Sequence, residues 1–202
     1  MGRRMSLARG ARLFSAGAPP GGIYGVVSGG IAVEGCTAWH PPRMGHVHRE
    51  GHWFGHGPAL NGGNRTMGFR ALEDSALLHV PLTALRREMR ADSEMARLVG
   101  QMADLGTSLA SWVACDLLIS SAPRRVAAVL LRVTGAHEGV TPSAPDGFLL
   151  TQSEIGEMAN ASRLHVNRVL GQFAENGWIA KSYKHLRLLD APALMRFAYR
   201  ED

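Results

Sequence analysis

The stretch SRLHVNRVL, residues 162–170, sets two arginines and an asparagine among valines and leucines. An arginine guanidinium can donate two hydrogen bonds to a guanine edge, and an asparagine amide can pair with an adenine edge. At helical spacing, Arg163, Leu164, Asn167 and Arg168 fall on one side of a helix, where a leucine either meets a thymine methyl or is a tolerated surface residue. The apolar residues fall on the other side: Val166, Val169, Leu170 and Phe173. The side chains suited to read bases are therefore predicted to face away from the core, although a merely solvated helix face has a similar composition.

Local signals on both sides of this stretch predict a helix-turn-helix. Thr151 and Glu154 form the pattern of a capping box, which starts a first helix. The inner face of that helix is expected to hold Ile155, Met158 and Ala159. Ser162 follows a short turn and is a good cap for the second helix, which we expect to end at Asn176-Gly177. Two short helices joined in this way form a helix-turn-helix.

A strand, a turn and a second strand are predicted next, in WIAKSYKHLRLL, residues 178–189. This hairpin would act as a wing that brings positive charge to DNA phosphates, where charge supplies affinity but no sequence choice. It contains the only two lysines of the chain, Lys181 and Lys184, together with His185 and Arg187. The predicted DNA-binding residues are Ser162, Arg163, Leu164, His165, Asn167, Arg168, Lys181 and Lys184.

The amino-terminal part of the chain differs in its amino-acid composition and pattern. Residues 1–90 are punctuated by glycines, and between them lie short runs rich in β-branched and aromatic residues, such as IYGVV and ALLHV. Many short strands with frequent turns predict an all-β roll or barrel.

A long helix is predicted from about residue 92 to 119, where apolar residues recur at spacings of three and four. The members of this stripe are Met95, Leu98, Val99, Met102, Leu105, Leu109, Trp112 and Val113. The stripe either packs on its own domain or forms the seam of a coiled-coil dimer, and its heptad spacing favours the seam, which Asp116 would end. Ser120–Pro123 is interpreted as a hinge, with Pro123 at the first position of a further helix. The predicted fold is thus α+β, with a β-roll at 1–90, a dimerisation helix and hinge at 91–121, and a winged helix-turn-helix at 122–202.

The charge of the chain is modest but local. The formal net charge of the 202 residues is +5, and the window from Arg163 to Arg187 holds five basic residues and a single acid, Glu175. Such a window fits contact with nucleic acid at one place. No apolar run approaches the roughly 20 residues that cross a bilayer, and Cys36 and Cys115 form no paired motif. We therefore expect a cytoplasmic protein with no membrane partner.

The segment LTQSEIGEMANASRLHVNRVLGQFAENGWI, residues 150–179, resembles the winged helix-turn-helix of the Crp/Fnr superfamily of bacterial transcription regulators. FSAGAPPGGIYGVVSGGIAV, residues 14–33, resembles the family's cyclic-nucleotide-binding β-roll, a cupin-like jelly roll, and the long helix resembles its dimerisation helix. The resemblance implies a homodimer that reads a palindromic DNA operator, with RNA polymerase as a further partner. Arg163 and Arg168 match family residues that touch DNA, whereas Leu164 stands where the cyclic-AMP-responsive members carry a base-reading glutamate.

The resemblance also implies an effector site in the β-roll, formed here by Gly55, His56, Arg65 and Thr66. In family members that bind cyclic nucleotides, an arginine and a neighbouring hydroxyl hold the cyclic phosphate, and a glutamate holds the ribose. Arg65 and Thr66 keep the first pair, and a buried guanidinium beside a hydroxyl is a suitable anion site. His56 replaces the glutamate, which removes the acceptor for the ribose hydroxyl. A cyclic nucleotide is one candidate effector, and the identity of the effector stays open.

A group of histidines supports a different interpretation. Its members are His40, His46, His48, His52 and His56. His46 and His48 would share one face of a strand, and GHVHRE partly resembles the metal motif of cupin enzymes, with a shorter spacing to Glu50. The alternatives to a ligand-modulated regulator are therefore a metal-dependent cupin-like enzyme and a metal or haem sensor. A surface cluster without a metal is the preferred interpretation, and no catalytic residue is predicted, because an enzyme gives no reason for the capped helix-turn-helix and the basic wing.

Overall fold

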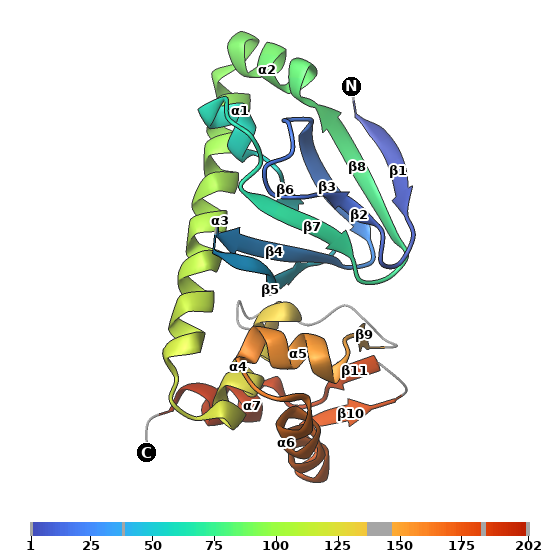
Figure 1. Cartoon of the computed structure of the whole chain (residues 1–202), viewed down its shortest axis with the longest axis vertical. Helices are drawn as coiled ribbons and strands as arrows, with labels where there is room; N and C mark the ends of the chain where they lie inside the picture. Colours follow the sequence, from blue (N-terminus) through green and yellow to red (C-terminus); the bar gives the residue numbers. More distant parts are fainter. Residues whose placement is uncertain (1, 38, 137–146, 183–184, 201–202) are drawn as a thin grey trace. The chain divides into compact units, whose positions relative to one another are not determined.

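The computed structural model describes residues 2–37, 39–136, 147–182 and 185–200 (Figure 1). The chain divides into two compact units, Met1–Trp112 and Val113–Asp202, each with its own buried apolar residues. The first unit combines two sheets with helices, and the second combines helices with one small sheet. This is the α+β arrangement that the sequence predicts. None of the helices formed by the described residues has both the length and the apolar character that a bilayer span requires.

Two four-stranded antiparallel sheets make up the β-roll of the first unit (Figure 1). In spatial order, the first sheet consists of β1 (Arg3–Leu7), β8 (Ser75–Pro81), β3 (Gly22–Ser28) and β6 (Trp53–Phe54). The second consists of β2 (Arg12–Phe14), β7 (Met67–Ala71), β4 (Ile31–Thr37) and β5 (His40–His48). The runs IYGVV and ALLHV lie within β3 and β8, as predicted.

Aromatic rings from the two sheets meet in the core of the roll. Phe54 of β6 stacks on Phe69 of β7 with 4.4 Å between ring centroids, and Tyr24 of β3 lies 5.7 Å from Phe54. Ile31 and Leu77 have no exposed surface in the same cluster. Burial of each such side chain contributes about 1.5–3 kcal/mol, so this apolar layer holds the two sheets face to face.

Strand β1 was not evident from the sequence, and β5 was expected only around His46 and His48. β1 contains two arginines, and β5 contains two prolines, so neither shows the alternation of apolar and polar residues that marks a half-buried strand. Both lie at the edge of a sheet, where one side of the strand needs no partner and proline is tolerated. The place of β1 depends on pairing with β8, which is distant in sequence, whereas β5 forms a hairpin with the preceding strand, β4.

The described residues of the first unit also form α1 (Gly57–Asn61), α2 (Leu82–Ala91) and most of α3 (Ser93–Leu118). The part of α3 from Val113 onward belongs to the second unit. The apolar stripe predicted on α3 divides into two sides. Met95, Val99 and Met102 pack against Ile23 and Leu85, so one side of α3 lies on its own unit. The other side leaves Leu98, Leu105 and Trp112 43%, 64% and 37% exposed, at intervals of seven residues. Packing on its own unit is therefore confirmed for one side of α3, whereas the dimer seam stays a prediction for the exposed side.

Besides the end of α3, the described residues of the second unit form four helices and a three-stranded sheet in the order β10-β11-β9. The helices are α4 (Ala122–Val133), α5 (Gln152–Ala159), α6 (Arg163–Glu175) and α7 (Ala191–Tyr199), and the strands are β9 (Phe148–Leu149), β10 (Ile179–Lys181) and β11 (His185–Leu188). Helix α4 is the central element, because every residue from Val126 to Val133 is buried.

Two details at helix starts differ from the prediction. Helix α4 begins at Ala122, so Pro123 is its second residue and not its first, and Ser121 makes no side-chain capping bond. Proline fits both positions because neither amide has a partner within the helix. Helix α7 was not predicted, although Asp190 accepts a hydrogen bond from the amide of Ala193 at 2.8 Å and so caps it.

The end of α3 belongs to the second unit, where a buried ion pair links it to α4. Arg132 Nε donates to Asp116 Oδ2 at 2.8 Å, and the hydroxyl of Tyr199 donates to Asp116 Oδ1 at 3.0 Å. Burial, followed by the charge of Asp116, raises the pKa of Tyr199 above its ordinary value. The sequence predicted only that Asp116 would interrupt the apolar stripe; the structure shows that this carboxylate joins α3 to α4 and α7.

Candidate functional site

The helix-turn-helix forms from the local signals that predicted it. Thr151 Oγ1 accepts from the Glu154 amide at 3.2 Å, and Glu154 Oε2 accepts from the Thr151 amide at 2.8 Å, which completes the capping box of α5. Ser162 Oγ accepts from the His165 amide at 3.2 Å and caps α6. Gly177, at φ 73°, ends α6, and the Trp178 amide reaches back to the carbonyl of Phe173.

The turn between α5 and α6 is closed by a tight backbone approach. Asn160 adopts a left-handed conformation at φ 48°, and the Ala161 amide donates to the Gly156 carbonyl at 2.9 Å. A Cβ atom at Gly156 would lie 2.5 Å from the carbonyl oxygen of Ala161. Only glycine therefore allows the chain to turn this sharply and aim α6 away from α5.

The two faces of α6 separate as predicted. Val166, Val169, Leu170 and Phe173 are buried. Arg163, Leu164, Asn167 and Arg168 are exposed, and Leu164 keeps 72% of its surface in solvent. No acidic side chain among the described residues forms an ion pair with Arg163 or Arg168. This face therefore presents two arginines whose charge is not neutralised within the described part of the chain.

Gln152 is a residue of this surface that the sequence did not single out. Its Nε2 donates to Asn167 Oδ1 at 2.7 Å, so the first residue of α5 positions an amide on α6. The Asn167 Nδ2 group remains available as a donor for a base edge.

His165 differs from the other predicted DNA-binding residues of α6, because its side chain is half-buried. Its Nε2 atom is buried and has no hydrogen-bond partner among the described residues.

The predicted wing is the antiparallel pair β10 and β11, extended by β9. Lys181 and Arg187 are exposed on these strands. Lys184 lies outside the described residues. The exposed cations of the hairpin and those of α6 belong to the same unit, as contact with DNA phosphates requires.

Arg65 is the central residue of the predicted effector site. Its side chain is buried, with Nη2 donating to the Gly22 carbonyl at 3.1 Å and Nη1 donating to the Gly55 carbonyl at 3.3 Å. The guanidinium carbon lies 3.7 Å above the ring of Phe14. Desolvation lowers the pKa of Arg65, which the nearby Tyr24 partly opposes. No carboxylate among the described residues pairs with this buried cation.

The other predicted effector residues differ in their burial and in their contact with Arg65. Gly55 accepts from the guanidinium and lies at φ 86°, where a Cβ atom would come within 2.9 Å of Arg65 Nη1. Thr66 follows Arg65 and is exposed. His56 is half-buried, its Nδ1 lacks a hydrogen-bond partner among the described residues, and burial lowers its pKa. The site thus keeps the guanidinium of Arg65, which can bind an anionic group, but it has no carboxylate at position 56 to accept a hydrogen bond from a ribose hydroxyl.

The histidines do not form a surface cluster as a whole. His40 and His52 are exposed, but His46 and His48 are only 4% and 9% exposed, and the ring of His48 stacks on Phe54 and Phe69 of the core. Burial, followed by the charges of His52 and His56, lowers the pKa of His48 to about 3. The interpretation as a surface cluster is therefore wrong for His46 and His48.

Comparisons with known proteins cover both units. Residues 4–92 match the cyclic nucleotide-binding domain, and residues 124–197 match the Crp-like helix-turn-helix domain. A relative from Mycobacterium tuberculosis, described as a CRP-like cAMP-activated global transcriptional regulator, is 26% identical over 198 residues, which covers 94% of this chain and 85% of the relative.

Solved structures share the fold at low sequence identity. FixK2 from Bradyrhizobium japonicum has a TM-score of 0.83 at 19% identity, with 100% of both chains covered. A CRP/FNR-family transcriptional regulator from Thermus thermophilus has a TM-score of 0.72 at 22% identity, with 97% of this chain and 98% of the other covered.

The turn of the helix-turn-helix gives a test with a matched control. Gly156→Ala should lower the free energy of unfolding by roughly 1–3 kcal/mol, because the added methyl group meets backbone. Gly171→Ala, within α6, meets no atom within 4 Å and should raise stability by up to about 1 kcal/mol, since alanine is the better helix former. Urea unfolding of the two variants should show opposite signs, and equal stability would contradict the close approach at Gly156.

Proposed function

Because this chain belongs to the Crp/Fnr family of DNA-binding transcription regulators, we propose that it acts as a homodimer that places one α6 helix in each half of a palindromic operator. The observation that carries the proposal is the exposed face of α6, where two arginines without acidic partners among the described residues flank a leucine and an asparagine. The family is one of regulators, so the role proposed is regulatory and not catalytic. RNA polymerase would be a further partner of the DNA-bound dimer, and the protein would act in the cytoplasm.

Each residue of the α6 face has a proposed task. Arg163 and Arg168 bind guanine edges or phosphates, and Asn167, held by Gln152, donates to a base edge. Leu164 contacts a thymine methyl, since a leucine 72% exposed on this face gains little from its own fold. Ser162, His165 and the wing cations Lys181 and Lys184 are proposed to complete the contact, mainly with phosphates.

Helix α3 supplies the proposed dimer contact. Leu98, Leu105 and Trp112 repeat every seven residues on the side of α3 that does not pack on Ile23 and Leu85. Two such stripes from two copies would bury each other in a parallel coiled coil. A dimer with two-fold symmetry matches the two-fold symmetry of a palindrome.

Arg125 supports a coupling between the hinge and the helix-turn-helix. Its Nη1 donates to the carbonyls of Ile119 and Ser120 at 2.7 and 3.0 Å, within the short connection from α3 to α4. Its Nε donates to the carbonyl of Ala159 at 2.8 Å, and its Nη2 donates to that of Asn160 at 3.2 Å, at the end of α5. We propose that an effector changes the geometry of this connection and that Arg125 conveys the change to the turn that aims α6.

The effector is proposed to be an anionic, phosphate-bearing molecule bound at Arg65. The support is a buried guanidinium with no carboxylate partner in the described part of the chain, two of whose donors are used by backbone carbonyls. A cyclic nucleotide would bind weakly, because His56 offers no carboxylate to accept from its ribose. The M. tuberculosis relative is described as cAMP-activated, which makes cAMP the first compound to test.

Loss of Arg168 tests the DNA assignment. Selection from a random DNA pool with the full chain should return a palindromic site, and Arg168→Ala should lower affinity for that site by about 100-fold or more, since a base or phosphate contact is lost in both half-sites. Arg196→Ala is the control, because it removes the same charge from an exposed position on α7. Sedimentation should show the same oligomeric state for both variants. Retained affinity in Arg168→Ala would reject its assignment.

The hinge proposal is tested with neighbouring arginines of α4. Arg125→Met should lower operator affinity by roughly tenfold, which is a typical size for the coupling between two linked sites of a protein. Arg124→Met is the matched control, because Arg124 donates to the carbonyls of Ala198 and Arg200 at the end of α7 and not to the hinge. Gel-shift titration of both variants against the selected operator compares them directly. Equal losses in the two variants would show that Arg125 has only a structural role.

The effector proposal is tested by restoring the missing carboxylate. His56→Glu should strengthen cAMP binding by about 10-fold or more, which corresponds to one recovered hydrogen bond to a charged group. Adding Arg65→Gln to that variant should remove the gain, because the phosphate loses its cation. Equilibrium dialysis with labelled cAMP measures all three proteins. Absence of binding in both the natural chain and His56→Glu would exclude cyclic AMP as the effector.

A further inference from the structure

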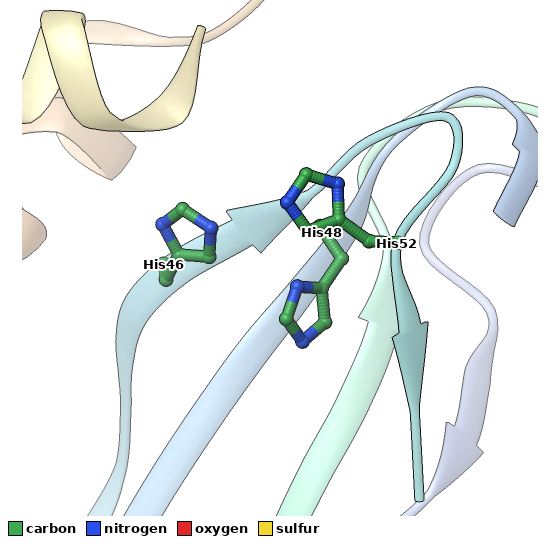
Figure 2. A group of neighbouring side chains, drawn as sticks. All are labelled: His46, His48 and His52. Atoms are coloured by element: carbon green, nitrogen blue, oxygen red, sulfur yellow. The ribbon is translucent and has the colours of Figure 1, made fainter. Parts of the chain in front are cut away.

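Three imidazoles of the β-roll converge on one point. His46 and His48 are two residues apart on β5 and so face the same side of the strand, and His52 approaches from the turn that follows. Each ring offers one nitrogen, and these three nitrogens lie within 4.8 Å of one another. Figure 2 shows the three rings around a shared space. Their centroids are separated by 5.4 Å (His48–His52), 5.5 Å (His46–His48) and 6.4 Å (His46–His52).

His48 is held in place by the aromatic core. Its ring stacks on Phe54 at 5.4 Å and on Phe69 at 6.0 Å between centroids. Its Nδ1 is buried and has no hydrogen-bond partner among the described residues. A buried polar nitrogen without a partner costs about 1–3 kcal/mol, so a ligand at this fixed ring would recover that cost.

His52 is oriented by a backbone carbonyl. Its Nδ1 lies 3.2 Å from the carbonyl oxygen of Arg49, and a carbonyl only accepts, so Nδ1 must carry the hydrogen. The neutral ring therefore presents the lone pair of Nε2, which is the arrangement that commonly fixes a metal-binding histidine. His52 is also exposed, which gives an ion a path from solvent to the two buried rings. The neighbouring cation, Arg49, is ion-paired with Glu73.

We propose that His46, His48 and His52 form a binding site for a divalent transition-metal ion, with zinc as the ion that fits best. Imidazole is a preferred ligand of zinc, copper, nickel and iron, and three protein ligands with one position left for solvent are a common zinc arrangement. Zinc–nitrogen bonds of about 2.0–2.1 Å put tetrahedral ligands about 3.4 Å apart, so nitrogens separated by at most 4.8 Å need only small ring rotations to close on the ion. The exposed His52 has the freedom to make them.

The three histidines are not among the residues of the proposed effector site at Arg65, and the proposal does not depend on DNA binding. The metal site also differs from the cupin-like arrangement considered for the sequence, because its third member is His52 and not Glu50. The sequence placed His52 in the histidine group together with His40 and His56, and the structure brings His52 alone of these three to His46 and His48, from the turn after β5.

Metal titration of the full, untagged and chelator-treated chain tests the proposal. Competition between the protein and a chromogenic zinc indicator should give one Zn²⁺ per chain, and Co²⁺ should give the visible absorption of a tetrahedral nitrogen-ligated ion. His52→Ala and His46→Gln should each weaken zinc binding by about 100-fold or more, since loss of even an outer partner of a metal site costs 10–100-fold. His40→Ala is the matched control, an exposed histidine at the start of the same strand, and should bind as the natural chain does.

His52 is exposed, so its replacement leaves the core of the roll intact, and an unchanged circular dichroism spectrum verifies this. Binding of less than half an ion per chain would overturn the proposal. So would a zinc affinity of His52→Ala equal to that of His40→Ala. Operator binding of the same chelator-treated protein, measured in parallel, separates failure of the metal site from failure of the regulatory function.

Discussion

The arrangement of the second unit depends on the hydrogen bonds donated by one side chain, the guanidinium of Arg125. It donates to two carbonyls in the connection between α3 and α4 and to two at the end of α5. Carbonyls at helix ends have no partner within their own helix, and a planar group with several N–H donors can satisfy four of them at once. The end of one helix and the turn of the helix-turn-helix are therefore fixed relative to α4 by one side chain.

The ion pair of Asp116 with Arg132 acts on the same element. Asp116 belongs to the last turns of α3, and Arg132 lies in the fully buried half of α4. A buried pair of this kind adds little net stability compared with apolar residues, but removing one partner leaves a buried charge and is costly. The pair therefore specifies how the last turns of α3 pack on α4 within the second unit.

The β-roll likewise contains buried polar groups that lower its stability but can bind a specific ligand. Arg65 and His48 are polar groups set against the aromatic rings of the core, where apolar residues of the same size would be less costly. Each retains hydrogen-bonding capacity that the described residues do not use. Two such groups in one small roll fit an interior that binds ligands as well as holding the fold together.

Helix α3 explains why the sequence alone left two interpretations of its stripe. One side of the helix, around Val99, packs on its own unit, and the other side, through Leu98 and Leu105, is left exposed. Both sides are apolar at spacings of three and four, so periodicity predicts the helix but not which residues meet which partner.

The sequence by itself determined the features that depend on neighbours along the chain. The capping box at Thr151, the cap at Ser162, the left-handed Gly177 and the separation of the α6 faces all follow from spacings of a few residues, and the structure confirms each of them. Tertiary structure alone decided what joins residues beyond their immediate neighbours: the pairing of the edge strand β1 with β8, the carbonyl partners of Arg125 and Arg65, and the meeting of His52 with His46 and His48. Local spacing sets backbone conformation through sterics and short-range hydrogen bonds, whereas these contacts exist only after the chain has folded back on itself.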